Sequence, residues 1–596
     1  MRFQTRFIQV HLRQLLFWRR NLFQINEYFN GPKIDISPKS GQPVELTDDA
    51  SYRVGYDFFI FELRRHSGET VAMQYAFAVH FLRWIVIPAV IGLSVALAYA
   101  VNGIDDRTYS RTIAAYGLLV PSIWIPIYIR MWQRKCAELS VIWNTSTTNE
   151  RAYLNKEYSG ATSKLTSDLI ENGEDDTNGK YRVFPFYVVF FISQLIVMMV
   201  GTSVFISCHV YLNSYEACNT TTSYVCLSSA TRWVLSIIIS VSMGALMSFF
   251  QVKAKSIASW FAKMENHRLE FRLSESLIEK TFWMQWTSLY PWFMSVSFAF
   301  VAFGEDLHAF LEANASSLLV FKFDRRAFDL NSTLVVPIYA YLGINFVILT
   351  MLPSVHLLRK HRRIVEKSKE PIELQVIDQN QRLKAHSFSA QLRFNLDMPV
   401  GIHCPDIQQS FRDLVESMNL TQRASYKDYD DIVVYLGIIA SFSVVSPIIS
   451  VIACVHALCE LHCDVLKMAF VYQRSQPRRA RNAGSWEKYL LVAMVLGGII
   501  SVGMVCFSTG HLEAFVQGCE RSANYGPNHD CVSISYRIMV ALLLEHLVLI
   551  LQALTMSLIS REPKWIAWRS FDTQRRRYQF MKNYKKTEGH YVETRK

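Results

Sequence analysis

Long runs of apolar residues alternate with polar segments over most of this 596-residue chain. A helix needs about 20 predominantly apolar residues to cross the hydrocarbon core of a bilayer, and runs near that length recur along the sequence. The pattern predicts an all-α, polytopic membrane protein with ten transmembrane helices. They are predicted at about residues 81–101, 112–130, 184–211, 232–251, 279–303, 333–357, 430–447, 448–468, 488–508 and 536–559.

The predicted helices divide the chain into three parts. A short cytosolic N-terminal region (1–76) precedes the ten-helix domain (77–560), and a basic cytosolic tail (561–596) follows it. Two polar stretches within the middle part, about 133–182 and 359–427, are predicted to be cytosolic loops. Basic clusters between the apolar runs place both termini in the cytosol by the positive-inside pattern. The exception is a group of basic residues in a loop predicted to lie outside, namely Lys322, Arg325 and Arg326.

The net charge of +12 comes from basic residues that cluster in the predicted loops and the tail. Retention on the cytosolic side and attraction to anionic lipid explain these clusters, so phospholipids are the expected partners and nucleic acid is not. The protein is predicted to be an integral protein of either the plasma membrane or an endomembrane. The successive residues His462, Cys463 and Asp464 would point about 100° apart on a helix and do not converge as a catalytic group. No other catalytic spacing stands out, and the chain is not predicted to be an enzyme.

Several residues carry signals of an outside location. Asn219 and Asn331 each begin an Asn-x-Thr sequence and are candidate glycosylation acceptors. Some disulfides are expected among five of the eleven cysteines, with their connectivity open: Cys208, Cys218, Cys226, Cys519 and Cys531.

Four carboxylates lie in one apolar hairpin, where charged side chains are costly and therefore indicate a functional site. Asp428 and Asp431 are three positions apart and Glu460 and Asp464 are four apart, so each pair shares one face of a helix. If the chain turns near Ser446 and Pro447, each arm rises roughly 21 Å, which brings all four acids to one depth.

Two carboxylates about 6 Å apart repel by roughly 3 kcal/mol, so four together call for cations. Oxygen ligands without a Cys or His set favour Ca²⁺ or Mg²⁺ over zinc. The alternative is that both pairs lie at solvated helix ends in the headgroup region and bind nothing.

Six short sequences resemble the anoctamin family of calcium-regulated lipid scramblases and anion channels, and they occur in the same order and at the same loops as in that family. They are SGETVAMQYAFAVHFLRW, WQRKCAELSVIW, ENHRLEFRLSESLIEKTF, FNLDMP, PRRARNAGSW, and LLEHLVL with REPKW. The similarity covers most of the chain. It departs at the N-terminus, where roughly 75 residues are too few for the compact cytosolic α/β domain that the family usually carries.

The resemblance implies that Asp428, Asp431, Glu460 and Asp464 are calcium ligands on helices seven and eight. Helix six should add an Asn-x-x-x-Glu sequence followed by Pro, but the chain reads NFVILTMLP. Asn345 therefore fits as a weaker ligand, whereas Leu349 stands where the family has an acid. Because that acid couples calcium to movement of helix six in the family, we expect calcium to bind here and to gate weakly.

The resemblance also implies a homodimer with the last transmembrane helix at its interface and a groove lined by helices three to seven. Ser236, Ser240 and Gln285 are candidate groove residues, although serines also allow helices to pack closely. Lys280, with Lys253 and Lys255, is a candidate for attracting anions or lipid phosphates, or serves positive-inside retention. The implied activity is calcium-regulated phospholipid scrambling with associated ion conduction. The alternatives are a calcium-activated chloride channel and a non-conducting tether or scaffold.

Overall fold

The computed structural model describes a set of residues that includes most of the predicted helices. These residues are 56–102, 105–143, 145, 178–214, 229–300, 309–310, 312–314, 331–352, 355, 427–470, 478–519, 527–528, 531–568, 571–572, 575–576 and 578–579. Regular structure within them is helical. The predicted loop at 359–427, apart from Lys427, and Asn219, Cys218 and Cys226 lie outside the described residues.

The chain forms two compact units. The larger unit comprises Leu22–Val347, Ala424–Leu461 and Gln476–Lys596, and the smaller comprises Met1–Asn21, Ile348–Arg423 and His462–Ser475. The contacts described below lie within the larger unit unless the smaller one is named.

Seven stretches in the described part of the chain are long and apolar enough to cross a membrane, and each coincides with a predicted span. Their helices are α5 (Glu69–Asn102), α6 (Asp106–Leu119) with α7 (Ile125–Ile142), α9 (Asn178–Ser214), α10 (Ser229–Met264), α18 (Ile448–Phe470), α19 (Trp486–Gly503) and α20 (Ile534–Leu558). The chain is therefore an integral, multi-pass membrane protein. The helix α7 continues beyond Gln133, where the first loop was predicted to begin.

The other three predicted spans coincide with helices that are shorter or more polar. They are α11 (Glu270–Met294), α13 (Val336–Asn345), and α17 (Lys427–Phe442). The first turns of α11 carry several charged residues, whereas the run around α13 is apolar but short. Ten crossings therefore stay a prediction.

Short π-helical segments interrupt or extend several spans, and the sequence pattern does not predict them. One of them, η1 (Val120–Trp124), joins α6 to α7 and contains Pro121. Because proline has no backbone N–H to donate, the regular hydrogen-bond ladder cannot continue through this position. The two flanking helices still form one continuous apolar stretch, Asp106–Ile142.

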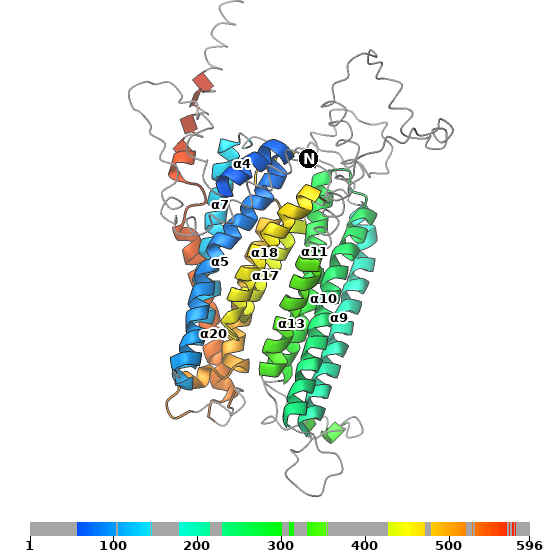
Figure 1. The fold of residues 1–596 in the computed structure, drawn as a ribbon, viewed down its shortest axis with the longest axis vertical. Helices are drawn as coiled ribbons and strands as arrows, with labels where there is room; N and C mark the ends of the chain where they lie inside the picture. The colour runs from blue at the N-terminus through cyan, green and yellow to red at the C-terminus, as the bar shows by residue number, and fades with distance from the viewer. Residues whose placement is uncertain are drawn as a thin grey trace, which may run out of the picture. The chain divides into compact units, whose positions relative to one another are not determined.

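The helix α10 packs against α9, α11 and α13, as Figure 1 shows for these neighbouring helices. The helix α17 packs mainly against α19 and also contacts α5 and α6. Glycines allow two of these contacts to be very close. A Cβ atom added at Gly497 on α19 would lie 2.3 Å from the Cβ of Ala440 on α17. One added at Gly117 on α6 would lie 2.4 Å from the Cα of Val444, two residues beyond the end of α17.

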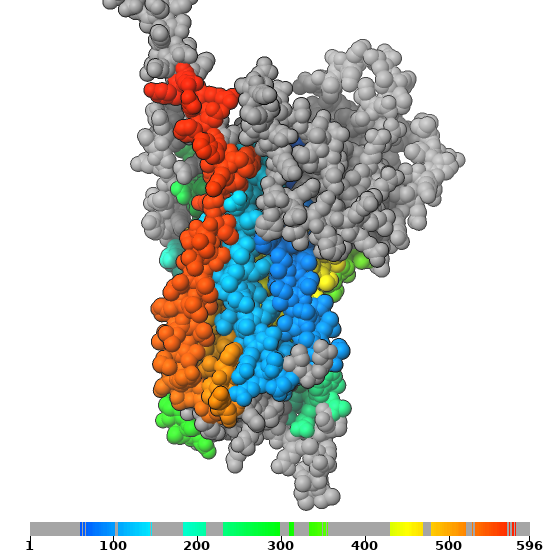
Figure 2. Space-filling model, turned by 90° about the vertical axis from the view of Figure 1, so that its left-hand side faces the viewer, coloured from blue at the N-terminus to red at the C-terminus, as the bar shows by residue number. Residues whose placement is uncertain are grey.

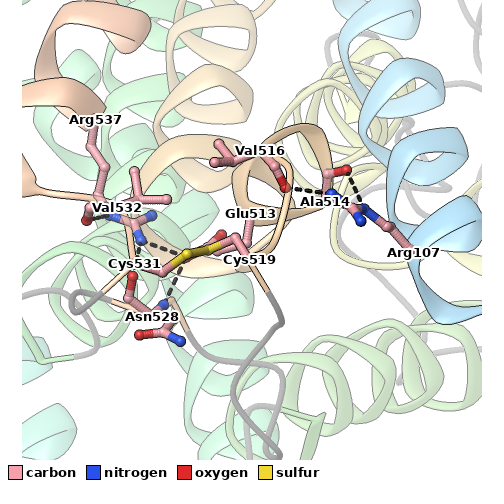
Figure 3. The surroundings of a disulfide bond; sticks show 9 residues. All are labelled: Arg107, Glu513, Ala514, Val516, Cys519, Asn528, Cys531, Val532 and Arg537. Atoms are coloured by element: carbon pink, nitrogen blue, oxygen red, sulfur yellow. Dashed lines mark hydrogen bonds and ion pairs between the residues drawn. A yellow bond between two sulfur atoms is a disulfide. The ribbon is translucent and has the colours of Figure 1, made fainter.

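A buried ion pair lies beside a disulfide at the N-terminal end of α20, as Figure 3 shows. Arg537 is paired with Glu513, and both side chains are 0% exposed. Arg537 also donates to the carbonyl oxygens of Cys506 at 2.8 Å and Asn528 at 3.0 Å. The disulfide joins Cys519 to Cys531, which confirms that two of the five candidate cysteines pair, whereas Cys208 is a free thiol.

The helix α20 forms the orange ridge along one side of the face in Figure 2, next to α7. Large apolar side chains are exposed along it, among them Leu542, Leu543, Leu547, Ile550 and Leu554. Such a surface suits lipid as well as a second copy of the chain. The predicted homodimer through this helix stays a prediction.

Candidate functional site

One face of α10 carries polar and small residues along most of its length. Ser240, Ser248 and Gln251 are buried, whereas Phe249 and Val252 beside them are exposed. Spacings of three and four positions place residues on one side of an α-helix. We call this set the α10 stripe, and its members are Ser236, Ser240, Gly244, Ser248, Gln251 and Lys255. The stripe thus lies against the neighbouring helices.

The α10 stripe contacts α9 near its start. Ser236 and Ser240 lie 3.5 Å and 3.3 Å from the ring nitrogens of His209. Farther along, Gly244 brings α10 against α13, because a Cβ atom there would lie 2.7 Å from the Cβ of Ala340 and 2.9 Å from the carbonyl oxygen of Pro337. Both predicted groove serines therefore belong to this buried face, and the structure brings them together at one histidine.

An acidic cluster meets the last member of the stripe. The Nζ atom of Lys255 lies 2.8 Å from Oδ2 of Asp430 and 2.7 Å from Oδ1 of Asp431, both on α17. The predicted groove residue Gln285 donates from Nε2 to Oδ2 of Asp430 at 2.7 Å. The side chain of Asp430 is 1% exposed. Three helices, α10, α11 and α17, thus meet at one charge cluster, in which Asp430 is buried and Asp431 is partly exposed.

The other predicted calcium ligands occupy several positions. Asp428 is the second residue of α17, but its side chain lies outside the described residues. Glu460 lies 3.8 Å from Nε2 of His456, one turn earlier on α18. Asn345 is the last residue of α13 and is buried. Asp464, which accepts from Nζ of Lys467 at 2.8 Å, belongs to the smaller unit.

Leu349 also belongs to the smaller unit, and its side chain lies outside the described residues. Within the described part of the chain, no group of three or more His, Cys, Asp or Glu side chains is arranged to hold a metal ion. The four-carboxylate site and its weaker ligand Asn345 therefore stay a prediction.

On the α17 side of this site, the described ligand atom Oδ1 of Asp431 does not fit a calcium ion. Carboxylate oxygens are suitable ligands, and calcium binds them at about 2.3–2.6 Å. However, Oδ1 of Asp431 already has the ammonium group of Lys255 at 2.7 Å. Two cations cannot share that position on one oxygen, because they repel each other and overlap in space.

Sequence reasoning missed Asp430 and the role of Lys255. The basic sequence Lys253-Ala-Lys255 reads as a positive-inside cluster, and Asp430 is hidden between the two acids that match the family pattern. The spacing of the polar residues could have predicted the position of Lys255, because Ser248, Gln251 and Lys255 are three and four residues apart and lie on one helix face. Its partner on α17 is about 175 positions away, so spacing alone does not identify it.

Lys280 contacts a different buried acid. Its Nζ atom lies 2.8 Å from Oε1 of Glu265, which also accepts hydrogen bonds from His267 and Ser276. Asn266 has a φ of 50°, a left-handed conformation that asparagine tolerates in the turn between α10 and α11. The family-like string from Glu265 to Phe282 therefore builds a charged turn, and the structure places the ammonium of Lys280 on that turn.

The hydrogen bonds to Glu265 predict a pH-dependent stability. Burial raises the pKa of Glu265, but the hydrogen bonds from His267, Lys280 and Ser276 outweigh burial and lower the pKa from 4.5 to about 2. Because the folded pKa is the lower one, this stabilisation is present above about pH 4.5 and is lost as the pH falls toward 2. We expect Glu265→Gln to destabilise the protein by about 3 kcal/mol at neutral pH.

Thermal unfolding in detergent from about pH 7 to 3 measures this effect, and the gap between wild type and variant should narrow on acidification. Glu275→Gln is the matched control, since Glu275 is 40% exposed and pairs only with the exposed Arg272 among the bonds described, at 3.1 Å. An equal effect of the two substitutions would contradict the role given to Glu265.

Comparison with known proteins gives the family. The chain is 22% identical to human Anoctamin-10 over 457 residues, which are 75% of this chain and 57% of that protein. It is 27% identical to mouse Anoctamin-8 over 186 residues, which are 31% of this chain and 16% of that protein. The chain thus covers less than two thirds of either relative. The family model described as "Anoctamin: Calcium-activated chloride channel" matches residues 63–570. By this match, which takes in the α10 stripe and its charge cluster, the chain belongs to the anoctamin family.

Proposed function

We propose that this chain is a phospholipid scramblase that conducts ions along the same path. The α10 stripe is the observation that carries the proposal. From Ser236 to Lys255 it spans 19 residue steps, which at 1.5 Å per residue is about 28 Å. That length is close to the ~30 Å thickness of the hydrocarbon core. A polar track of this length lowers the cost of moving a headgroup through hydrocarbon, where unpaired polar groups are costly.

The track is closed in this structure. Ser240, Ser248 and Gln251 are buried, and α10 meets α13 at Gly244 without room for a methyl group. Lipid headgroups therefore reach the stripe only when α10 and α13 separate. A scramblase with this geometry alternates between a closed state and a state in which the polar face is open to lipid.

A chloride channel is the second candidate, because the family description names calcium-activated chloride channels. The charge cluster favours lipid movement over anion conduction. Two aspartates and one lysine at Asp430, Asp431 and Lys255 sum to a formal charge of −1, and Lys280 is paired with Glu265. Regulation by calcium stays a prediction for either activity.

The full chain reconstituted in lipid vesicles tests the proposal. With fluorescent phospholipid in both leaflets and a membrane-impermeant quencher, a scramblase raises the quenched fraction from about half to nearly all. We expect this result for the wild type and at least about fivefold slower exchange for Gln251→Leu, which removes a polar side chain from the stripe.

Val252→Leu is the control, because this neighbouring side chain is exposed and lies off the stripe. Absence of exchange at every calcium concentration would overturn the proposal. A chloride current without lipid exchange would assign the second candidate.

A further inference from the structure

The ammonium group of Lys255 lies beside a predicted calcium ligand, so a cation that belongs to the chain itself stands next to that ligand. This ammonium group contacts two carboxylates on α17, at 2.8 Å and 2.7 Å. One of these, Asp431, is the position at which the sequence predicts a calcium ligand. The other, Asp430, is buried and is also bonded to Gln285.

A buried carboxylate such as Asp430 needs a partner, because its charge loses hydration on burial. Lys255 supplies one, and Gln285 supplies a further hydrogen bond to the same oxygen. The other carboxylate oxygen, Oδ1, has no hydrogen-bond partner among the described residues. The cluster keeps a formal charge of −1 rather than the −2 that the two aspartates would present to a metal ion. Both the occupied position and the reduced charge oppose a divalent cation.

We propose that Lys255 is a tethered cation that takes the place of calcium on the α17 side of the site and holds α10 against α17. The ion pair joins residues 176 positions apart in the sequence. A soluble ion added to this protein has to displace an ammonium group that the chain holds next to its own carboxylates, at a high local concentration. The position of α10 is consequently set by this ion pair, and calcium changes it little.

This inference deepens the proposed function and rests on it for its transport consequence only. Rupture of the Lys255 contacts frees the C-terminal half of α10, and the α10 stripe then opens to lipid. Wild-type transport is therefore expected to respond little to calcium. Loss of the ammonium group is expected to raise basal transport and to make it responsive to calcium.

Calcium binding to the purified full chain, measured by titration calorimetry with calcium chloride alone, tests the assignment directly. Removal of a competing group of this kind is expected to change affinity by about tenfold, within the usual range of coupling between two ligands. We therefore expect Lys255→Met to bind calcium about tenfold more tightly than the wild type. Lys255→Arg keeps the charge and is expected to bind as weakly as the wild type.

The matched control is Lys253→Met. Lys253 is on the same helix, two residues away, and its Nζ atom lies 5.7 Å from the centre of the Phe249 ring. This variant is expected to stay within about twofold of the wild type, since it leaves the α17 carboxylates untouched. Equal calcium affinity of Lys255→Met and the wild type would overturn the proposal, as would an equal gain for Lys253→Met.

A second variant covers the case in which Lys255→Met does not fold. The double variant Lys255→Met/Asp430→Asn keeps the formal charge of the cluster at −1 and leaves Asp431 without the ammonium group. It is also expected to bind calcium more tightly than the wild type, and no gain would overturn the proposal. Lipid exchange in vesicles is measured in parallel. If exchange is absent from every variant, the proposed function fails, whereas calcium affinity still decides the role of Lys255.

Discussion

Gly244→Val is expected to raise the basal rate of lipid exchange by about tenfold or more. The first atom that this substitution adds would lie 2.7 Å from the Cβ of Ala340 and 2.9 Å from two backbone atoms of α13, the carbonyl oxygen of Pro337 and the amide nitrogen of Tyr341. Backbone atoms cannot rotate away, so the two helices must part. Overpacking of this kind costs about 1–3 kcal/mol. That cost falls on the closed state, and 1.4 kcal/mol changes an equilibrium about tenfold.

Gly343→Val is the control for this experiment. Gly343 lies on α13, three residues from Ala340, and a Cβ atom there would meet nothing within 4 Å. Its substitution is expected to leave lipid exchange within about twofold of the wild type, because no packed neighbour must move. The vesicle assay compares both variants at equal reconstitution density. Unchanged exchange in a folded Gly244→Val protein would show that the α10–α13 contact does not close the path.

Arg537→Met is expected to cause the largest loss of stability among single substitutions at the ion pairs described here. The substitution removes the partner of Glu513 and three further hydrogen bonds to carbonyl oxygens, on Cys506, Asn528 and Val532. An uncompensated buried charge of this type costs about 3–5 kcal/mol. Stabilities of folded domains are themselves about 5–15 kcal/mol. The variant should therefore lose most of its yield as monodisperse protein in detergent and melt well below the wild type.

Arg576→Met provides the comparison, since Arg576 and Asp572 are 61% and 52% exposed and lie 2.7 Å apart. An exposed pair is worth about 0–1 kcal/mol, so this variant should melt close to the wild type. The double variant Glu513→Met/Arg537→Met should regain much of the stability, because it removes both buried charges. A wild-type melting temperature for Arg537→Met alone would refute the structural role of the pair.

The apolar runs predict the long helices well because membrane crossing imposes a length and a composition on a single segment. They predict the ends of the helices less well. The helix α5 begins at Glu69, before the predicted start at residue 81, because its first turns pack against α4 (Tyr56–Ser67) and bury apolar residues such as Val71 and Met73 there. Local sequence does not report such tertiary support.

For the predicted acids, too, local spacing predicts the position of a residue but not its partner. Spacing predicts Asp431 as a calcium ligand, which stays a prediction, and the structure places it in a charge cluster with Lys255. The partner of Asp431 is set by how α10 packs against α17, and no local pattern contains that information. Lys280 behaves in the same way, since its position at the start of a span is evident, whereas its contact with Glu265 depends on the left-handed turn at Asn266.

The close contacts of α17 have a consequence for motion. Gly497 and Gly117 hold the region from Ala440 to Val444 against α19 and α6 at distances that leave no space for a methyl group. A helix packed this tightly cannot shift without overlapping its neighbours. The helices α6, α17 and α19 therefore act as a fixed frame of reference, and Lys255 attaches the movable helix α10 to that frame. On this view the main degree of freedom is the displacement of α10 relative to this frame, and substitutions at Gly117 or Gly497 should change stability while leaving the rate of opening alone.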